Sequence, residues 1–176
     1  MRSKKRSLRF SMIAAITIDG RIAKDSHQLT DWTSVEDKNF LHKKLDASDV
    51  VIVGNNTFKT AREPLSKRNC IVFTRAIAGS RQKNENCLYV NPAGVDIIKL
   101  LQGKNYRRIA VLGGTQVYSW FLEKNLLDEI YLTVEPIVFG SGLPLFTAGL
   151  TRDTQYKLIS AKKLNNKGSV LLHYVN

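Results

Sequence analysis

The stretch Ile109-Ala-Val-Leu-Gly-Gly-Thr-Gln-Val-Tyr118 is the part of the sequence that decides the expected fold. An apolar run leads into the pair Gly113-Gly114 and then directly into a segment with helical character. The apolar run predicts a buried strand, and paired glycines allow a close approach to the main chain that side chains forbid. Free N–H groups at the start of the following helix favour phosphate. The pattern therefore suggests a nucleotide cofactor, although it is neither a G-x-G-x-x-G nor a Walker motif.

The composition is that of one globular domain. The chain has 176 residues, of which 43% are hydrophobic and 24% charged, and this balance excludes a disordered protein. No apolar run approaches the roughly 18 residues of a membrane span, and no signal-type region follows the basic N-terminus. We therefore expect a cytoplasmic protein with no membrane partner, divided into a basic tail, 1–8, and a single domain, 9–176.

The net charge of +12 is compatible with several partners. Five basic residues fall within the first nine, and the remainder are scattered without the interleaved aromatic residues of a nucleic-acid platform. Nucleic acid is therefore not the expected partner, whereas a phosphate-bearing substrate and cofactor would suit the charge. The two cysteines fit a reducing compartment. Their spacing matches no zinc pattern and the three histidines do not cluster with them, so no metal is expected.

Strands and helices are predicted to alternate along the chain, which is typical of crossover units and a largely parallel sheet. The expected class is an α/β fold with a mainly parallel central sheet, flanking helices and a C-terminal antiparallel hairpin. The expected strands are Leu8–Thr17, Val50–Val53, Cys70–Thr74, Cys87–Val90, Arg108–Leu112, Asp128–Glu135, Gln155–Lys163 and Ser169–Val175. The expected helical segments are Ser34–Ala47, Asn56–Ala61, Val95–Leu101 and Gln116–Glu123, and residues 21–33 are expected to form a loop.

Three strand ends carry residues suited to phosphate. They are Gly54-Asn55-Asn56-Thr57, Thr74-Arg75 and Gly113-Gly114-Thr115. In open α/β sheets, ligands bind beyond the carboxyl ends of the strands. Three such turns at one edge of the sheet could hold one extended dinucleotide.

At this point the chain resembles the dihydrofolate reductase superfamily, including the pyrimidine reductases of riboflavin synthesis. The resemblance covers nearly the whole chain through short motifs whose order and spacing are fairly specific. The motifs are Ala14-Ala15 with Ile18-Asp-Gly-Arg-Ile22, Asp31-Trp32, Val51-Ile-Val-Gly54 with Thr57, Val111-Leu-Gly-Gly-Thr-Gln-Val-Tyr118, and Ile130-Tyr-Leu-Thr133. The resemblance implies a dihydrofolate-reductase-like fold.

By this resemblance the cofactor is NADPH. The family's glycine turn, with a cis Gly-Gly bond, matches Leu112, Gly113, Gly114, Thr115, Gln116 and Val117. A second phosphate-binding turn matches Gly54, Asn55, Asn56 and Thr57, although the family often has a basic residue where this chain has Asn55. Arg75, after Thr74, is then the candidate for the 2′-phosphate, because a guanidinium can hold phosphate through two hydrogen bonds. Ala15 and Ile22 match positions that wall the nicotinamide.

The substrate side is expected on the first helix, where folate reductases place one carboxylate. Asp37 and Glu36 are both candidates for the acid, although each also fits a helix capping box. Leu41 and Phe40 lie one turn further on and are the corresponding apolar contacts. Thr133 matches a threonine that hydrogen-bonds the carboxylate or substrate. Trp32 matches a tryptophan near the substrate, and Ile13 is also expected there.

The resemblance implies an NADPH-dependent reductase of a pterin-like or aminopyrimidine heterocycle. The motif at Ile18–Ala23 and the segment Pro136–Phe146 are more similar to the pyrimidine reductases. The ribosylamino-pyrimidine phosphate of riboflavin synthesis is therefore the first expected substrate, and dihydrofolate is the alternative. The sequence contains no zinc signature of the deaminase that is fused to some of these reductases. A non-enzymatic nucleotide- or RNA-binding module is the alternative of another class, and a homodimer is a further expectation from the resemblance.

Overall fold

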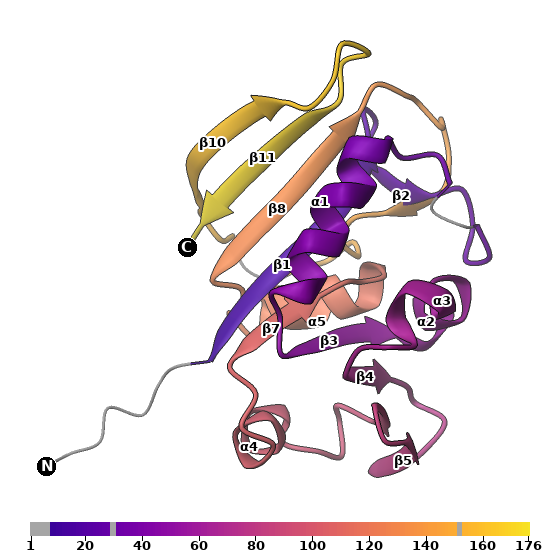
Figure 1. The fold of residues 1–176 in the computed structure, drawn as a ribbon, viewed down its shortest axis with the longest axis vertical. Coiled ribbons are helices and arrows are strands. Elements are labelled where there is room, and N and C mark those ends of the chain that lie inside the picture. The colour runs from indigo at the N-terminus through magenta and orange to yellow at the C-terminus, as the bar shows by residue number, and fades with distance from the viewer. Residues whose placement is uncertain (1–7, 29–30, 151–152) are drawn as a thin grey trace, which may run out of the picture.

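The computed structural model describes residues 8–28, 31–150 and 153–176, so of the basic segment 1–8 only Leu8 is described. A nine-stranded sheet runs through the molecule in the order β10-β11-β8-β1-β7-β3-β4-β6-β5 (Figure 1). The six strands from β8 to β6 in this order are parallel to their neighbours, whereas β11, β10 and β5 are antiparallel. The mainly parallel sheet and the C-terminal hairpin are therefore confirmed.

The strands of the large sheet have the following bounds. They are β1 (Arg9–Thr17), β3 (Val50–Gly54), β4 (Cys70–Phe73), β5 (Ser80–Asn84), β6 (Cys87–Val90), β7 (Arg108–Val111), β8 (Glu129–Glu135), β10 (Lys157–Lys163) and β11 (Val170–Val175). A separate two-stranded sheet pairs β2 (Arg21–Ala23) with β9 (Leu143–Pro144).

Helices cover both faces of the sheet because alternate side chains of the central strands point to opposite sides. Met12 and Ile52 belong to one core, and Ile13 and Val53 to the other. The first core packs against α4 (Ile97–Gly103) and α5 (Thr115–Glu123). The second packs against α1 (Val35–Asp46), α2 (Asn55–Thr60) and α3 (Arg62–Leu65). Figure 1 shows α1 lying across β1 and α5 on the far side of the sheet.

Some short elements differ from the sequence prediction. The strand β5 was not predicted, because all five of its side chains are exposed and it carries no apolar periodicity. The segment 21–33, predicted as a loop, contains β2, which is held by pairing with the distant β9. Neither β5 nor β2 is marked by a pattern within its own stretch of sequence. No helix within the described residues is long and apolar enough to cross a bilayer.

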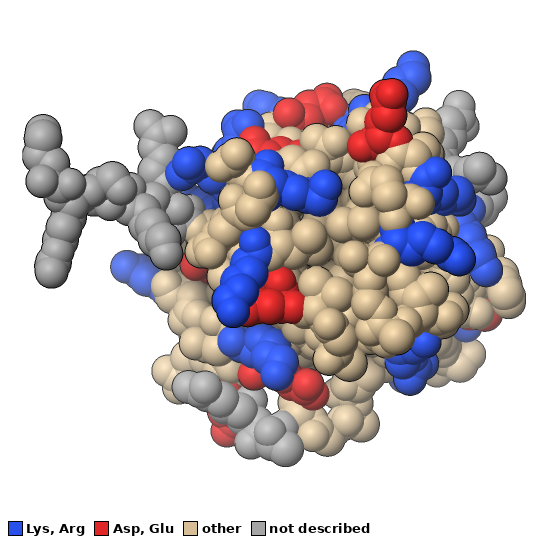
Figure 2. Space-filling model, turned by 90° about the horizontal axis from the view of Figure 1, so that it is seen from below, with Lys and Arg blue, Asp and Glu red and all other residues tan. Residues whose placement is uncertain are grey.

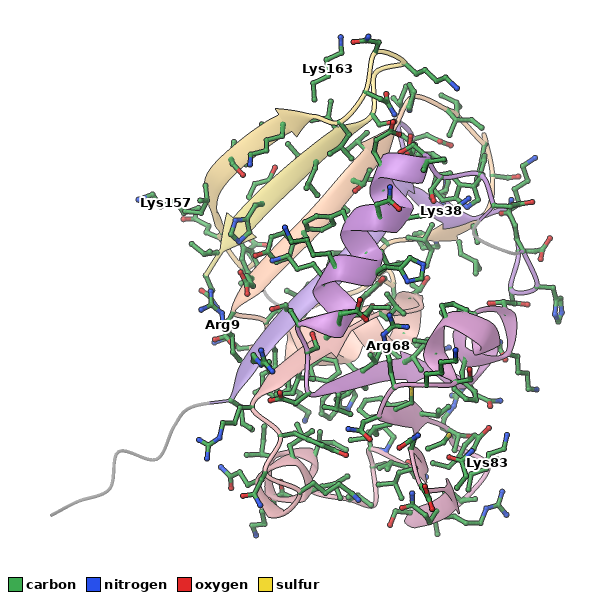
Figure 3. The ribbon with its side chains drawn as sticks, viewed as in Figure 1. Arg9, Lys38, Arg68, Lys83, Lys157 and Lys163 are labelled. Carbon is green, nitrogen blue, oxygen red and sulfur yellow. The ribbon has the colours of Figure 1, made fainter. Side chains whose placement is uncertain are left out.

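A buried polar cluster closes the end of the sheet where β1 and β8 begin, and Arg9 in Figure 3 marks this end. The Glu129 carboxylate accepts hydrogen bonds from Ser11 (2.7 Å), Tyr131 (2.8 Å) and Arg9 (3.0 Å), and lies 2.9 Å from His173 Nε2. Burial alone would raise its pKa, but these partners outweigh burial and lower the pKa of Glu129 to about 2. The ionised carboxylate therefore stabilises the folded chain.

We predict that Glu129→Gln destabilises the protein in a pH-dependent way. The pKa of Glu129 is depressed on folding, so its contribution is complete above its unfolded pKa and disappears as the pH falls from about 5 to about 2. The pKa difference corresponds to a free energy of unfolding on the order of 3 kcal/mol at pH 7. Urea unfolding of both proteins across this pH range measures the difference.

Glu36→Gln is the matched control. Glu36 is exposed, and among the described residues its side-chain hydrogen-bond partner is Asn165. We expect its unfolding midpoint to stay close to that of the unmodified protein. An equal loss in both variants would contradict a specific role for the Glu129 cluster.

Candidate functional site

A large cavity of about 1060 Å³ opens beyond the carboxyl ends of β1, β3, β4 and β7. Ligand pockets in proteins commonly have volumes of roughly 300–1,000 Å³, so this cavity is large enough for an extended ligand. All three of the predicted strand-end turns contribute to its wall. The wall residues drawn from these turns are Gly54, Asn55, Asn56, Thr57, Thr74, Arg75, Gly114, Thr115, Gln116 and Val117.

Two glycine turns meet at the floor of the cavity. The Gly54 N–H donates to the Gly113 carbonyl over 2.6 Å, so the ends of β3 and β7 touch through their main chains. A Cβ atom on Gly54 would lie 3.2 Å from Val117 Cγ2, and one on Gly114 would lie 3.3 Å from Thr57 Oγ1. The peptide bond between Gly113 and Gly114 is cis, as the resemblance implies.

The glycine turn leads into the N-terminus of α5. Gly114 is the N-cap residue and has no side chain to bond the first N–H groups of the helix. Thr115, Gln116 and Val117 form the first turn and all line the cavity. The free N–H groups of a helix start and their partial positive charge favour an anion. This wall of the cavity is therefore suited to a phosphate group.

The segment after β9 forms a wall that the sequence alone did not reveal. Thr115 Oγ1 donates to the Pro144 carbonyl over 2.6 Å, and Ser119 Oγ accepts from the Thr147 N–H over 2.9 Å. These two bonds hold residues 144–147 against α5. The cavity residues that were not predicted include Leu143, Pro144, Thr147 and Ala148 from this segment, and Thr33, Lys38, His42, Leu45, Thr60, Ala61, Pro64 and Leu65 from the opposite wall.

Asp37 is the buried carboxylate of the cavity. It lies in the first turn of α1, is 7% exposed, and lines the cavity wall. Burial raises its pKa above the ordinary value, hydrogen bonds from Thr133 and Thr33 partly oppose this, and the charge of Glu135 raises it further. At a given pH, more of this carboxyl is therefore protonated than an exposed aspartate would be.

Glu36, the other candidate acid, does not line the cavity. Its exposed carboxylate accepts a hydrogen bond from Asn165 Nδ2 over 3.1 Å on the outside of the molecule. Phe40 is also outside the cavity wall, and its ring lies 5.3 Å from that of Tyr131 in the second core. The helical periodicity explains both positions, because residues adjacent to Asp37 and Leu41 point to another face of α1.

The remaining predicted substrate residues fall in two groups. Ile13, Trp32 and Leu41 line the cavity with Asp37, as do Ala15, Ile22 and Leu112 nearer the glycine turn. Thr133 is not part of the wall but bonds Asp37 from beneath. Trp32 packs edge-on against Phe139 at 5.1 Å, and its buried Nε1 has no hydrogen-bond partner among the described residues.

Two basic side chains stand at the rim beside Asp37. Lys38 and His42 lie one helical turn apart on α1 and both line the cavity. Figure 3 shows Lys38 on the upper part of α1, at the opposite end of the sheet from Arg9. Their position was not predicted, because four-residue spacing on a charged helix is usually a solvated face.

Comparison with known proteins identifies the family. The model of the RibD C-terminal domain matches residues 11–170. The chain belongs to this family. Its relatives include the uncharacterized protein YwjB of Bacillus subtilis, which is 29% identical over 92% of this chain and 94% of its own length. Dihydrofolate reductase type 8 of Escherichia coli is 31% identical over 61% of this chain and 63% of its own length.

Solved structures of the RibD type share the fold. A putative riboflavin biosynthesis protein from Shewanella sp. PV-4 superposes with a TM-score of 0.73 at 22% identity, over 96% of this chain and 98% of its own. Acinetobacter baumannii RibD superposes with a TM-score of 0.76 at 16% identity, and the match covers 97% of this chain but 58% of that one. The chain thus corresponds to just over half of that RibD. The predicted dihydrofolate-reductase-like fold is confirmed.

We predict that Gly113→Ala disrupts the cavity. Gly113 has a φ of +96°, and an added Cβ would lie 2.6 Å from Tyr118 Cζ in the core. The Tyr118 ring cannot move freely, because its hydroxyl donates to the Ile13 carbonyl over 2.7 Å. A forced shift of core and backbone costs about 1–3 kcal/mol or more, which thermal unfolding would detect.

Gly79→Ala provides the control for this substitution. An added Cβ at Gly79 meets nothing within 4 Å, and its φ lies outside the left-handed region. The unfolding midpoint of this variant should stay near that of the unmodified protein. A Gly113→Ala protein with an unchanged midpoint would contradict the steric argument.

Proposed function

We propose that the protein is an NADPH-dependent reductase of a heterocyclic substrate. The observation that carries the proposal is the presence of a buried carboxyl, Asp37, in the same cavity as the Gly113-Gly114 turn and the start of α5. Reduction of a ring or an imine needs a hydride on one atom and a proton on its neighbour. The end of the cavity at the glycine turn is suited to the hydride donor, and the end at Asp37 is suited to the proton donor. Membership of the RibD C-terminal domain family supports the same conclusion.

NADPH would lie along the three strand-end turns and supply the hydride. Gly54 and Gly114 leave room for its diphosphate, and the free N–H groups of Thr115 and Gln116 would bind it. Arg75 stands at the cavity wall after β4 and would bind the 2′-phosphate. Ala15 and Ile22 would wall the nicotinamide and exclude water from it.

The chain's own part in the reaction is to orient the acceptor and deliver a proton. Trp32, Leu41 and Ile13 line the cavity beside Asp37 and would hold the heterocycle. Asp37 would donate its proton to the atom next to the carbon that receives the hydride. Thr133 bonds Asp37 and would keep its carboxyl turned toward the substrate.

We infer that the first substrate to test is the ribosylamino-pyrimidine phosphate of riboflavin synthesis. The family match supports it, and the basic rim of Lys38 and His42 is suited to an anionic group next to the ring. In Figure 2, the Lys and Arg side chains are spread over the face with acidic residues between them, rather than gathered in one nucleic-acid-binding stripe.

Dihydrofolate is the second candidate, favoured by the match to dihydrofolate reductase type 8. Oxidation of NADPH, followed at saturating concentrations of each heterocycle, would separate the two substrates. A fluorescence titration with methotrexate is an independent test, and tight binding would overturn the pyrimidine assignment.

We predict that Asp37→Asn lowers turnover about 10²- to 10⁴-fold, because it removes the proton donor. For the unmodified protein, kcat/KM should fall as the pH rises through the raised pKa of Asp37. This fall with pH should be absent in the variant. Binding of NADPH should be nearly unchanged. The variant should also be no less stable at neutral pH, since a buried group with a raised pKa is unfavourable when ionised.

Glu36→Gln, one residue away and outside the cavity, is the control and should retain its turnover. Unchanged turnover in Asp37→Asn would contradict the assignment of the proton donor.

We predict that Arg75→Gln reduces the preference for NADPH over NADH by about 10- to 100-fold, the value of a charge-assisted pair of hydrogen bonds to phosphate. The KM for NADH should change little. Arg81→Gln on β5 is the control, because Arg81 is exposed and does not line the cavity. An unchanged cofactor preference in Arg75→Gln would transfer the role to another residue.

A further inference from the structure

Glu135 is a buried carboxylate that the proposed reaction does not use. It ends β8, is 4% exposed, and does not line the cavity. One carboxylate oxygen accepts a hydrogen bond from Oγ of Ser169, the buried residue just before β11. The other oxygen accepts two from Ser34, one from the N–H over 2.8 Å and one from the hydroxyl over 2.6 Å. A buried charge held by three donors is costly to remove and indicates a specific role.

Ser34 connects this carboxylate to Asp37. It is the N-cap residue of α1, and its Oγ also accepts from the Asp37 N–H over 3.3 Å. A continuous path of hydrogen bonds therefore runs from Glu135 through Ser34 to the main chain of Asp37. Figure 1 shows the start of α1 beside the end of β8, where this path lies. The first turn of α1 is thus hydrogen-bonded to Glu135 through its N-cap residue.

We propose that Glu135 is a positioning residue for Asp37: through Ser34 it fixes the helix turn that carries this carboxyl, and it places a second buried carboxylate beside that turn. The inference rests on the proposed function only for its effect on turnover. The charge effect concerns two carboxyl groups of the chain and exists with or without a substrate.

Several other groups face Asp37 and act on the same carboxyl. Thr33 and Thr133 donate hydrogen bonds to it from the loop before α1 and from β8, and both favour the ionised form. Lys38 on α1 favours ionisation through its charge. Tyr118 on α5 is neutral, because burial raises its pKa well above the ordinary value. Glu135 is the anion that opposes these effects, in the same direction as burial.

The position of Glu135 on its strand supplies a matched control. Glu129, Tyr131, Thr133 and Glu135 alternate along β8 and so share the face toward α1. Glu129 is as buried as Glu135 but sits at the other end of the strand, bonded to Ser11, Tyr131, Arg9 and His173. Substitution of either glutamate should therefore reduce stability. Only substitution of Glu135 should change the pKa of Asp37.

The test is a carboxyl ¹³C NMR titration of the full chain, with the Asp37 signal assigned by its loss in Asp37→Asn. Glu135→Gln keeps an acceptor for Ser34 but removes the charge. We expect the pKa of Asp37 to fall in Glu135→Gln and to stay unchanged in Glu129→Gln. An unchanged Asp37 pKa in folded Glu135→Gln would overturn the charge effect, even if no heterocycle is reduced.

Ser34→Ala covers the case in which Glu135→Gln fails to fold. It leaves Glu135 itself unchanged and removes the hydroxyl that joins Glu135 to the Asp37 N–H, so the positioning effect can be tested without the Glu135 variant.

Turnover tests the positioning effect separately. Ser34→Ala keeps the Glu135 charge but breaks the path to Asp37, and kcat should fall about 10- to 100-fold while the Asp37 pKa changes little. In Glu135→Gln, the fall of kcat/KM with rising pH should instead begin at a lower pH. Full kcat in Ser34→Ala would overturn the positioning effect. Absence of activity in the unmodified protein with every heterocycle would contradict the proposed function and leave the NMR results standing.

Discussion

The contact between the ends of β3 and β7 is the constraint on which the site depends. The Gly54 N–H bonds the Gly113 carbonyl, and no side chain separates the two turns. Because β1, β7, β3 and β4 are parallel neighbours, all of their carboxyl ends open on the same side. The close approach brings the starts of α2 and α5 to one wall. A Cβ at Gly54 would crowd Val117 across this contact, and one at Gly113 would clash with the Tyr118 ring in the core.

The other half of the cavity depends on α1, which is held by polar contacts at its N-terminus. Glu135 and Ser34 fix its first turn, and Thr133 bonds Asp37 from the sheet beneath. The apolar residues Leu41 and Leu45 on the same helix complete the wall. Burial gives Asp37 its raised pKa, and the surrounding hydrogen bonds limit the cost of that burial. The polar contacts along the face of β8 toward α1 therefore hold both the helix and the Asp37 carboxyl in place.

Long apolar strands and their turn residues were readable from the sequence. The strands around Val50–Val53 and Arg108–Leu112 and the closing hairpin were correctly predicted, because their apolar patterns are local. The exposed β5 and the pairing of β2 with β9 were missed, because neither has a local apolar signal. Lys38, His42 and the segment from Leu143 to Ala148 were missed for a related reason. Their place in the cavity wall depends on elements distant in the sequence.

The sequence by itself determined the glycine turns, the order of strands and helices, and a short set of candidate acids. These follow from backbone freedom and from the period of apolar residues, which each segment carries within itself. Only the tertiary structure showed that Asp37 lines the cavity and that Glu36 does not. The two are adjacent on α1, and the contacts with Thr133 and Asn165 fix which face of the helix meets the cavity. Burial and its effect on pKa arise from packing against distant strands, and no local pattern encodes them.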